Sequence, residues 1–338
     1  MLFGRVHLSE FRQDPTTKEW IIVASHRAKR PHDFINKQHE PDIPSYEAKC
    51  PFCSGNEYLS PNEIFRYPAD GNSSWRVRVV TNKYPVLVLN GGTQHREESD
   101  FFNKMSGIGV HDVIIETPVH NRFIYLMTDD EVSELLAVYR ERYRQLSTDA
   151  RIKLIIIFKN HGKTAGTSLV HPHSQLVATP IVPAENNRQF EVAIDYRNDT
   201  GRCLYYDIID HELKFKERVV IDTNEFIVFH PFASRVPFET WIMPKNGLAS
   251  FGNISMPDLV NLAPVLKMTL QKLHIALANP DFNYAIHTAP VGDEDKDYYS
   301  WYIRIVPRLT SIAGFEIGSG MYINTALPEE TAEFIRNT

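Results

Sequence analysis

The chain has 338 residues, 43% of them hydrophobic and 23% charged, which is typical of a globular protein with one large domain or two. Its formal net charge of −6 argues against a nucleic acid or an anionic membrane as the main partner. We find no secretory leader and no apolar run near the ~20 residues of a membrane span, so we expect a cytoplasmic protein.

The first fifty residues predict a turn at Asp14-Pro15-Thr16-Thr17 and a strand from Trp20 to Ala24. A basic stretch follows, Ser25-His26-Arg27-Ala28-Lys29-Arg30-Pro31. Three cations in four residues, closed by a proline that disfavours helix, indicate a fixed basic loop that could hold a phosphorylated ligand. A solvated surface cluster is the alternative interpretation, because such clusters are common on protein surfaces.

Two of the three cysteines form the pair Cys50-Pro51-Phe52-Cys53. In a chain without a leader, this pair is more typical of a metal site in a reduced compartment than of a disulfide. The spacing lets two thiolates bind one Zn²⁺, but a structural zinc site needs two further ligands. The sequence has no second pair of this kind, so histidines would have to supply them.

The middle of the chain predicts strands within Arg76–Leu89, at His111–Pro118 and at Arg151–Phe158. Residues 129–147 are the clearest helix, with Thr128 placed to cap it. Its apolar residues fall on one face at helical spacing: Val132, Leu135, Leu136, Tyr139, Tyr143 and Leu146. This stripe indicates packing, not a cofactor site.

The second half repeats the first at a nearly constant offset. Pro118 and Pro244, each directly after a strand, are 126 residues apart. Three further matching pairs are 127 residues apart: Thr128 and Ser255, Val132 and Leu259, Pro180 and Pro307. This spacing predicts a tandem duplication of one α+β unit. A second long helix is expected at 257–278, kinked or delayed by Pro264.

The run His171-Pro172-His173-Ser174-Gln175 follows a glycine-bearing loop, Asn160 to Ser168, at the end of a buried strand. Such a position is typical of an active site, and we expect one histidine to bind a structural element while the other faces substrate. Two polar loop residues are the alternative interpretation. At the offset of 127, His171 and His173 correspond to Tyr298 and Ser300, so one catalytic site per chain is expected.

These motifs resemble the galactose-1-phosphate uridylyltransferases of the histidine-triad superfamily. The resemblance covers nearly the whole chain, from the basic loop through Thr81-Asn82 and Pro118-Val119-His120 to Gly314-Phe315-Glu316. It implies an α+β fold made of tandem histidine-triad-like domains, with antiparallel sheets and packed helices. Residues 1–190 would form the domain with the zinc site and the catalytic histidine, and residues 191–338 the degenerate copy.

The resemblance also implies roles for individual residues. Zn²⁺ would be held by Cys50, Cys53, His120 and His171. His173 would be the nucleophile, Gln175 would steady its phosphorylated form, and Ser168 would hold phosphoryl oxygens. A neutral imidazole with a pKa near ~6.5 can attack phosphorus without a separate base. The nucleotide and its phosphates would be surrounded by Arg27, Arg30, Asn82, Asn160 and Gly166.

The tail of the chain is expected to contact the sugar through Phe315 and Glu316. A carboxylate can accept two hydrogen bonds from sugar hydroxyls, although a surface carboxylate is the alternative interpretation. In bacterial members of the family the last strand reads Trp-x-Leu-His-x-His and supplies a second metal site, whereas Trp301–Val306 has neither histidine here. Thr310-Ser311 replaces a Lys-Phe pair of those members, and Gly314–Asn324 resembles a branch that includes the ADP-glucose phosphorylases.

The first hypothesis is therefore a nucleotidylyltransferase with a nucleotidyl-histidine intermediate, namely a UDP-glucose–hexose-1-phosphate uridylyltransferase of galactose metabolism. ADP-glucose phosphorylase, which transfers an adenylyl group to phosphate, is the alternative. A nucleotide-sugar hydrolase and a non-catalytic zinc-ribbon binding module also stay open, although such a module needs neither His173 nor Gln175. The expected partners are a nucleotide sugar, a hexose 1-phosphate or phosphate, and a second copy in a homodimer, with no nucleic acid and no membrane.

Overall fold

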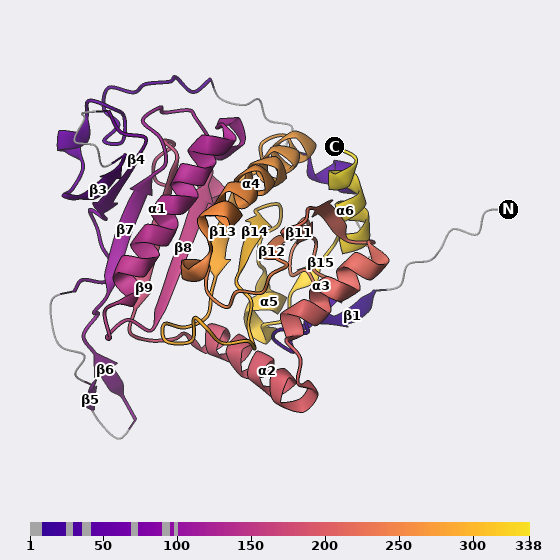
Figure 1. The fold of residues 1–338 in the computed structure, drawn as a ribbon. Helices are drawn as coiled ribbons and strands as arrows, with labels where there is room; N and C mark the ends of the chain where they lie inside the picture. The colour runs from indigo at the N-terminus through magenta and orange to yellow at the C-terminus, as the bar shows by residue number, and fades with distance from the viewer. Residues whose placement is uncertain (1–8, 25–29, 36–41, 69–73, 90–94, 98–100) are drawn as a thin grey trace.

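The structure, a computed structural model, describes residues 9–24, 30–35, 42–68, 74–89, 95–97 and 101–338. Ten strands of this part of the chain form one antiparallel sheet (Figure 1). Their order across the sheet is β10 (Val219–Asp222), β11 (Phe226–Phe229), β12 (Thr240–Pro244), β14 (Tyr302–Pro307), β13 (Phe282–His287), β8 (Leu154–His161), β9 (His173–Thr179), β7 (Val110–Ile115), β4 (Val77–Thr81) and β3 (Glu63–Tyr67).

The order of the strands reveals the duplication. From the centre outward, β8, β9, β7 and β4 of the first half mirror β13, β14, β12 and β11 of the second. Helix α1 (Asp129–Ser147) connects β7 to β8, and α4 (Met256–Leu277) connects β12 to β13 in the same way. The capping residues also match, because Thr128 accepts from Glu131 N at 3.2 Å and Ser255 from Asp258 N at 3.1 Å. The predicted tandem α+β fold is confirmed.

The two long helices lie side by side over one face of the sheet (Figure 1). Successive side chains of a strand point to opposite faces of the sheet, so the sheet has a hydrophobic cluster on each face. On β11, Phe226 and Val228 pack with side chains of α1 and α4, whereas Ile227 and Phe229 belong to the cluster on the opposite face. That opposite face is covered in the second half by α2 (Ala184–Thr200) and α3 (Leu204–Phe215). In the first half the same face packs against the segment that carries the cysteine pair.

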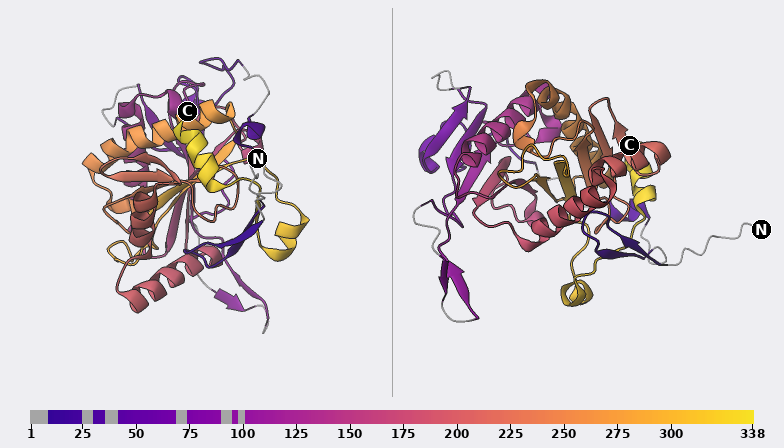
Figure 2. Two further views of the ribbon diagram at one scale, coloured as in Figure 1. Left: turned by 90° about the vertical axis from the view of Figure 1, so that its right-hand side faces the viewer. Right: turned by 60° about the horizontal axis from the view of Figure 1, so that its bottom comes forward.

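The remaining elements lie around this body. A small sheet joins β1 (Glu10–Gln13), β2 (Trp20–Val23) and β15 (Ile323–Asn324), and a hairpin joins β5 (His95–Glu97) to β6 (Asn103–Met105). Short 3-10 turns occur at η2 (Pro31–Phe34), η3 (Glu57–Leu59), η4 (Ile124–Leu126), η5 (Lys163–Ala165) and η6 (Phe251–Asn253). Helix α6 (Pro328–Arg336) packs near β10, whereas α5 (Gly314–Ser319) projects from the body (Figure 2). None of the helices in the described ranges is both long and apolar enough to cross a membrane.

Most predicted elements have the expected type. Helix α1 spans the predicted residues 129–147, and α4 starts at Met256 and continues through Pro264, so its start is not delayed. Within Arg76–Leu89, however, only Val77–Thr81 is a strand of the large sheet. The next residues leave the sheet after Asn82, whose backbone N–H still donates to His111 O at 2.9 Å.

One buried histidine of the second half predicts acid sensitivity of the fold. His230 is fully buried, its Nδ1 lies 2.7 Å from Thr331 Oγ1, and burial lowers its pKa to about 3. Below the unfolded pKa of about 6.5, the unfolded chain binds a proton at this position that the native chain excludes. Stability is therefore lost as the pH falls, at up to about 1.4 kcal/mol per pH unit for this one group.

We expect His230→Gln to flatten this dependence. Urea unfolding measures the free energy of unfolding at pH 7.5 and at pH 5. The loss of this free energy between the two pH values should be about 2 kcal/mol smaller in the variant than in the parent. Equal pH slopes in the two proteins would show that His230 is not a source of the acid sensitivity.

Candidate metal centre and active site

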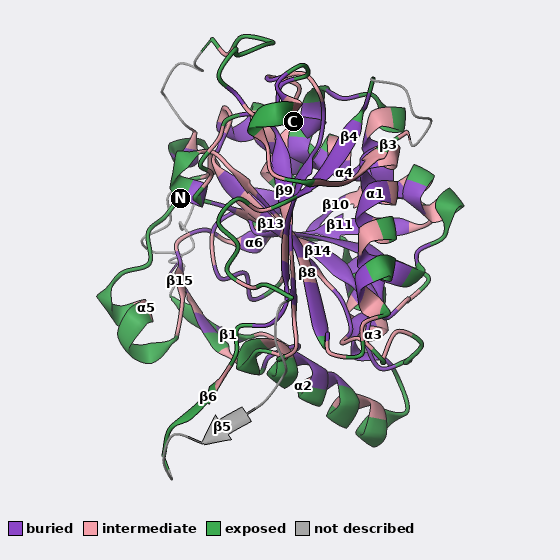
Figure 3. Ribbon diagram, turned by 90° about the vertical axis from the view of Figure 1, so that its left-hand side faces the viewer, coloured by how far each residue is buried: buried purple, intermediate pink, exposed green. Residues whose placement is uncertain are grey.

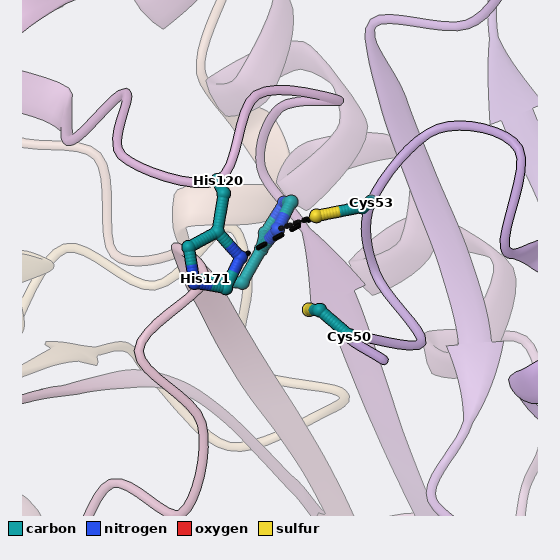
Figure 4. A group of neighbouring side chains, drawn as sticks. All are labelled: Cys50, Cys53, His120 and His171. Atoms are coloured by element: carbon teal, nitrogen blue, oxygen red, sulfur yellow. Dashed lines mark hydrogen bonds between the residues drawn. The ribbon is translucent and has the colours of Figure 1, made fainter. Parts of the chain in front are cut away.

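Four side chains that are distant in the sequence form one buried group (Figure 4). Cys50 and Cys53 come from the turn before η3, His120 follows β7, and His171 precedes β9. Their ligand atoms all lie within 4.8 Å of one another, with Cys53 Sγ 3.4 Å from His120 Nδ1 and 3.6 Å from His171 Nδ1. Ligand atoms of a tetrahedral site with bonds of about 2.0–2.3 Å are roughly 3.3–3.8 Å apart, so the group can hold one metal ion.

The surroundings orient these ligands. His171 Nε2 donates to Thr117 O at 2.7 Å, which leaves Nδ1 as the atom that faces the group. Asn56 donates to Cys50 O at 2.9 Å and holds the cysteine turn closed. Burial raises the pKa of the Cys50 thiol to about 11 and lowers that of the His171 imidazole to about 4, so burial disfavours the charged form of both side chains. A bound cation would favour the thiolates that burial disfavours.

His173 stands next to this group, at the first position of β9. Its Nδ1 lies 2.8 Å from His171 O, and because a carbonyl only accepts, Nδ1 carries the proton. Nε2 therefore keeps the lone pair. Burial lowers the pKa of His173, and the positive charge of Lys159 acts in the same direction. The imidazole is thus neutral and nucleophilic at physiological pH.

A buried ion pair supports the backbone of His173 from the opposite face of the sheet. Lys159 Nζ donates to Glu116 Oε2 at 2.7 Å and to His173 O at 3.2 Å. Ser174 donates to the other oxygen of Glu116 and also contacts Tyr139, whose hydroxyl lies 2.8 Å from that of Tyr284 in the second half. Neither Glu116 nor Lys159 is among the residues predicted for the site.

Gln175 is oriented by a residue that the sequence did not assign to this role. Val86 N donates to His111 Nδ1 at 3.3 Å, so His111 Nε2 carries the proton and donates to Gln175 Oε1 at 2.7 Å. The Gln175 NH₂ group is then left as a donor. Asn82 Nδ2 also lies 3.0 Å from His111 Nε2, but with the proton on Nε2 both atoms are donors, so this contact is not a hydrogen bond. His111 lies outside the metal group, between Gln175 and Asn82.

A cavity of about 530 Å³ opens beside His173. Asn160 and Ser168 line it together with the loop between β8 and β9, and Asn279 and Asp281 line it from the second half. In that loop Gly166 has a φ of +87°, which ends η5 and turns the chain toward Ser168. Another cavity, of about 680 Å³, lies against α3, and none of the predicted site residues lines it.

Arg30, Phe315 and Glu316 are not among the residues that line this cavity. Arg27 is outside the described residues, and Arg30 is exposed directly before η2. Phe315 and Glu316 lie on α5, which projects as an exposed segment (Figure 3). There Glu316 Oε2 accepts from Ala313 N at 3.1 Å and caps its own helix, while the Phe315 side chain is half exposed.

Strand β14, where the family resemblance would have placed a second metal site, carries an ion pair. Arg304 on β14 donates from Nε to Glu239 Oε1 at 2.7 Å, and both side chains are largely buried. In the described part of the chain, the group formed by the two cysteines, His120 and His171 is the one place where three or more such ligands converge.

Two family models match the chain one after the other. The model of the galactose-1-phosphate uridyl transferase N-terminal domain matches residues 4–183, and that of the C-terminal domain matches residues 185–336. The chain belongs to the galactose-1-phosphate uridyl transferase family. This result confirms the resemblance read from the motifs. It also makes the chain a member of an enzyme family of nucleotidyltransferases.

Relatives in this family are similar over nearly their whole length. ADP-glucose phosphorylase from Arabidopsis thaliana is 38% identical over 330 residues, which cover 97% of this chain and 92% of the relative. The galactose-1-phosphate uridylyltransferase of Haemophilus influenzae is 29% identical, over 92% of this chain and 88% of the relative. The galactose-1-phosphate uridylyltransferase of Thermotoga maritima is 28% identical, over 98% of this chain and 99% of the relative.

Solved structures of the uridyl transferase family have the same fold. A crystal structure of an ADP-glucose phosphorylase from Arabidopsis thaliana with bound ADP-glucose matches with a TM-score of 0.84 and 35% identity, over 98% of each chain. A uridylyltransferase structure matches with a TM-score of 0.76 and 26% identity, over 97% of each chain. Both activities considered from the sequence are therefore represented among the relatives.

Proposed function

We propose that the protein transfers a nucleotidyl group from a nucleotide sugar to a phosphate acceptor through His173. The observation that carries this proposal is the hydrogen bond of His173 Nδ1 to His171 O, which leaves Nε2 as the nucleophile beside the cavity. Nε2 attacks the α-phosphorus, a P–N bond forms, and the P–O bond to the sugar phosphate breaks. In the second step an acceptor oxygen attacks the same phosphorus and the P–N bond breaks.

The groups around His173 suit the charge that develops on phosphorus. Ser168 and Asn160 line the same cavity, and the NH₂ group of Gln175 is available because His111 occupies its oxygen. Preorganised donors of this kind stabilise phosphoryl oxygens in the transition state. We propose Zn²⁺ as the metal, in a structural role, because four protein ligands leave no open position for substrate. Held there, His171 would present the carbonyl that orients His173.

ADP-glucose with phosphate as acceptor is the substrate pair that we propose first. It is supported by the 38% identity to ADP-glucose phosphorylase, against 29% and 28% for two uridylyltransferases. The resemblance of Gly314–Asn324 to the branch that includes the ADP-glucose phosphorylases supports the same pair. Uridylyl transfer to galactose 1-phosphate is the second candidate, because the family models and most of the compared relatives carry that name.

Intact-mass measurement distinguishes the two candidates. The protein is incubated separately with ADP-glucose and UDP-glucose, and the adduct is then exposed to phosphate or to galactose 1-phosphate. An adenylyl adduct cleared faster by phosphate supports the first pair, and a uridylyl adduct cleared faster by galactose 1-phosphate supports the second. Hydrolysis of the nucleotide sugar without any adduct would overturn the nucleotidyl-histidine mechanism.

We propose that Glu316 binds the sugar in the active site of a second copy of the chain. Because α5 projects from the body and does not line the cavity of its own chain, we propose a homodimer in which it reaches a second copy. Glu316→Gln should slow exchange with the sugar 1-phosphate about 10-fold to 100-fold, as for lost charged hydrogen bonds. Hydrolysis of a preformed adduct by water should stay unchanged.

Glutamine still offers an oxygen to Ala313 N, so α5 should keep its cap in this variant. Phe334→Ala in α6 is a control for a general effect on the C-terminal segment, because Phe334 packs against the core instead. Sugar-phosphate exchange as fast in Glu316→Gln as in the parent would rule out Glu316 as a sugar ligand.

A further inference from the structure

The second half of the chain has no counterparts of His171 and His173, yet its side chains contact the loop that carries Asn160 and Ser168. We propose that Asn283 and Asp281 are positioning residues for this loop, residues 160–168, and set the direction in which Asn160 donates to a substrate phosphate. The proposal rests on the nucleotidyl transfer proposed above and adds what the degenerate half contributes to it.

The duplication itself brings these residues together. The central strands β8 and β13 are antiparallel, so the end of β8 lies beside the start of β13. Asn160 is paired with Asn283, and His161 with Phe282. Asn160 follows Phe158 on the same side of β8, and Phe158 is paired with Gln175, so Asn283, Asn160 and Gln175 face the same side of the sheet.

Asn283 determines how the Asn160 amide is turned. Its Nδ2 donates to Ala165 O and to Asn160 Oδ1, both at 2.8 Å. A backbone carbonyl can only accept, so the group that Asn283 presents to the loop must be its NH₂. The atom of Asn160 that meets this NH₂ group must then be the oxygen. The NH₂ of Asn160, a residue that lines the cavity, is thereby left for another acceptor, which we propose is a substrate phosphate.

Asp281 holds the other side of the loop. Its Oδ2 accepts from Thr164 N at 2.7 Å and from Thr164 Oγ1 at 2.6 Å. Gly162 has a φ of +85°, and a Cβ at this position would lie 1.7 Å from Asp281 Oδ1. The carboxylate therefore fills space that any side chain at residue 162 would need. Gly162 is therefore required both by its contact with Asp281 of the second half and by its own positive φ.

The turn between α4 and β13 delivers these side chains. Ala278 and Asn279 both have a positive φ, of 52° and 57°, which ends α4 and reverses the chain within two residues. Asn279 Oδ1 then lies 3.2 Å from His161 Nε2. Three side chains within five residues of the second half thus contact the loop, whereas the catalytic groups all belong to the first half.

Two substitutions of Asn283 separate positioning from simple support. Asn283→Ala removes both donated bonds, and we expect ADP or UDP, whichever the parent binds more tightly in calorimetry, to bind about 10-fold more weakly. Asn283→Asp places a carboxylate against two acceptors, so Asn160 should turn its NH₂ toward residue 283 and its oxygen toward the phosphates. Binding should then be weaker than in the alanine variant, by about another 10-fold.

A matched control is available in the same half. Asn324 is a buried amide that also bridges two backbone groups, donating to Ser234 O and accepting from Ala326 N at 2.9 Å each. Asn324→Ala should lower stability without changing the affinity for nucleotide. Hydrogen exchange supplies a readout without substrate, in which Asn283→Ala should speed exchange at residues 163–167 and Asn324→Ala should not.

The outcomes separate this inference from the proposed function. Unchanged exchange in the loop, or equal nucleotide affinity in the parent and both Asn283 variants, would overturn the positioning role. A parent protein that binds neither nucleotide and forms no adduct would count against the proposed function instead, and loop exchange would still decide the role of Asn283.

Discussion

His173→Ala is expected to abolish the nucleotidyl adduct and to lower turnover by at least about 10⁴-fold, as when the nucleophile of a covalent mechanism is removed. The reason is geometric, because His173 lines the cavity and its Nδ1 donates to a backbone carbonyl, so its Nε2 keeps the lone pair. The neighbouring His171 cannot replace it, since its Nδ1 faces the metal group and its Nε2 donates to Thr117 O.

The measurement is intact mass after incubation with the nucleotide sugar, together with steady-state turnover. His211→Ala is a suitable control, because His211 lines the separate cavity against α3, and that variant should form the adduct at the parental rate. An unchanged melting temperature in both variants would exclude unfolding as the cause. Labelling of His173→Ala would assign the nucleophile to another residue, with His161 the next histidine on the cavity wall.

The fold was predictable where one local pattern decided the structure. The apolar stripe from Val132 to Leu146 and the cap at Thr128 predict α1 to the residue, because helical spacing and capping act within a few turns. Helices α2 and α3 were not predicted. In α2 only Gln189, Phe190 and Ala193 are buried, so the helix has no continuous apolar stripe to reveal it.

The pairing of β8 with β13 could not be predicted from spacing alone. The repeat showed that the two halves share a fold, but not that their central strands join into one ten-stranded sheet. Such pairing depends on contacts more than 100 residues apart in the sequence. For the same reason the sequence did not reveal Asn283 or Asp281 as neighbours of the loop.

The candidate site was predicted through its motifs, and its supporting residues were missed. The spacing of Cys50 and Cys53 indicated a metal but left the histidines open, and the family resemblance supplied His120 and His171. Glu116 directly follows β7 and Lys159 lies near the end of β8, each after a run of apolar residues, and they are 43 residues apart in the sequence. Nothing local shows that they face each other, although a lone charge at the end of a buried strand is a signal to look for a partner.

His171→Asn is expected to lose the bound metal and thermal stability together. Four buried ligand atoms within 4.8 Å of one another are held apart from water, so the metal binds the native chain and not the unfolded one. A metal present at 1,000 times its Kd adds about 4 kcal/mol to the free energy of unfolding, and the variant should lose a contribution of this size. Metal content by atomic absorption and thermal unfolding with and without a chelator measure both effects.

His111→Asn is the matched control, because His111 is a histidine near the site that lies outside the metal group. The His111→Asn variant should keep its zinc, and its melting temperature should fall when a chelator is added, as in the parent. The His171→Asn variant should hold little zinc, and its melting temperature should change little with the chelator. Zinc content unchanged in His171→Asn, or lost in His111→Asn, would contradict the ligand set. Chelation of the parent should also slow adduct formation, because the carbonyl that receives His173 Nδ1–H belongs to His171 and moves when the metal no longer holds its ring.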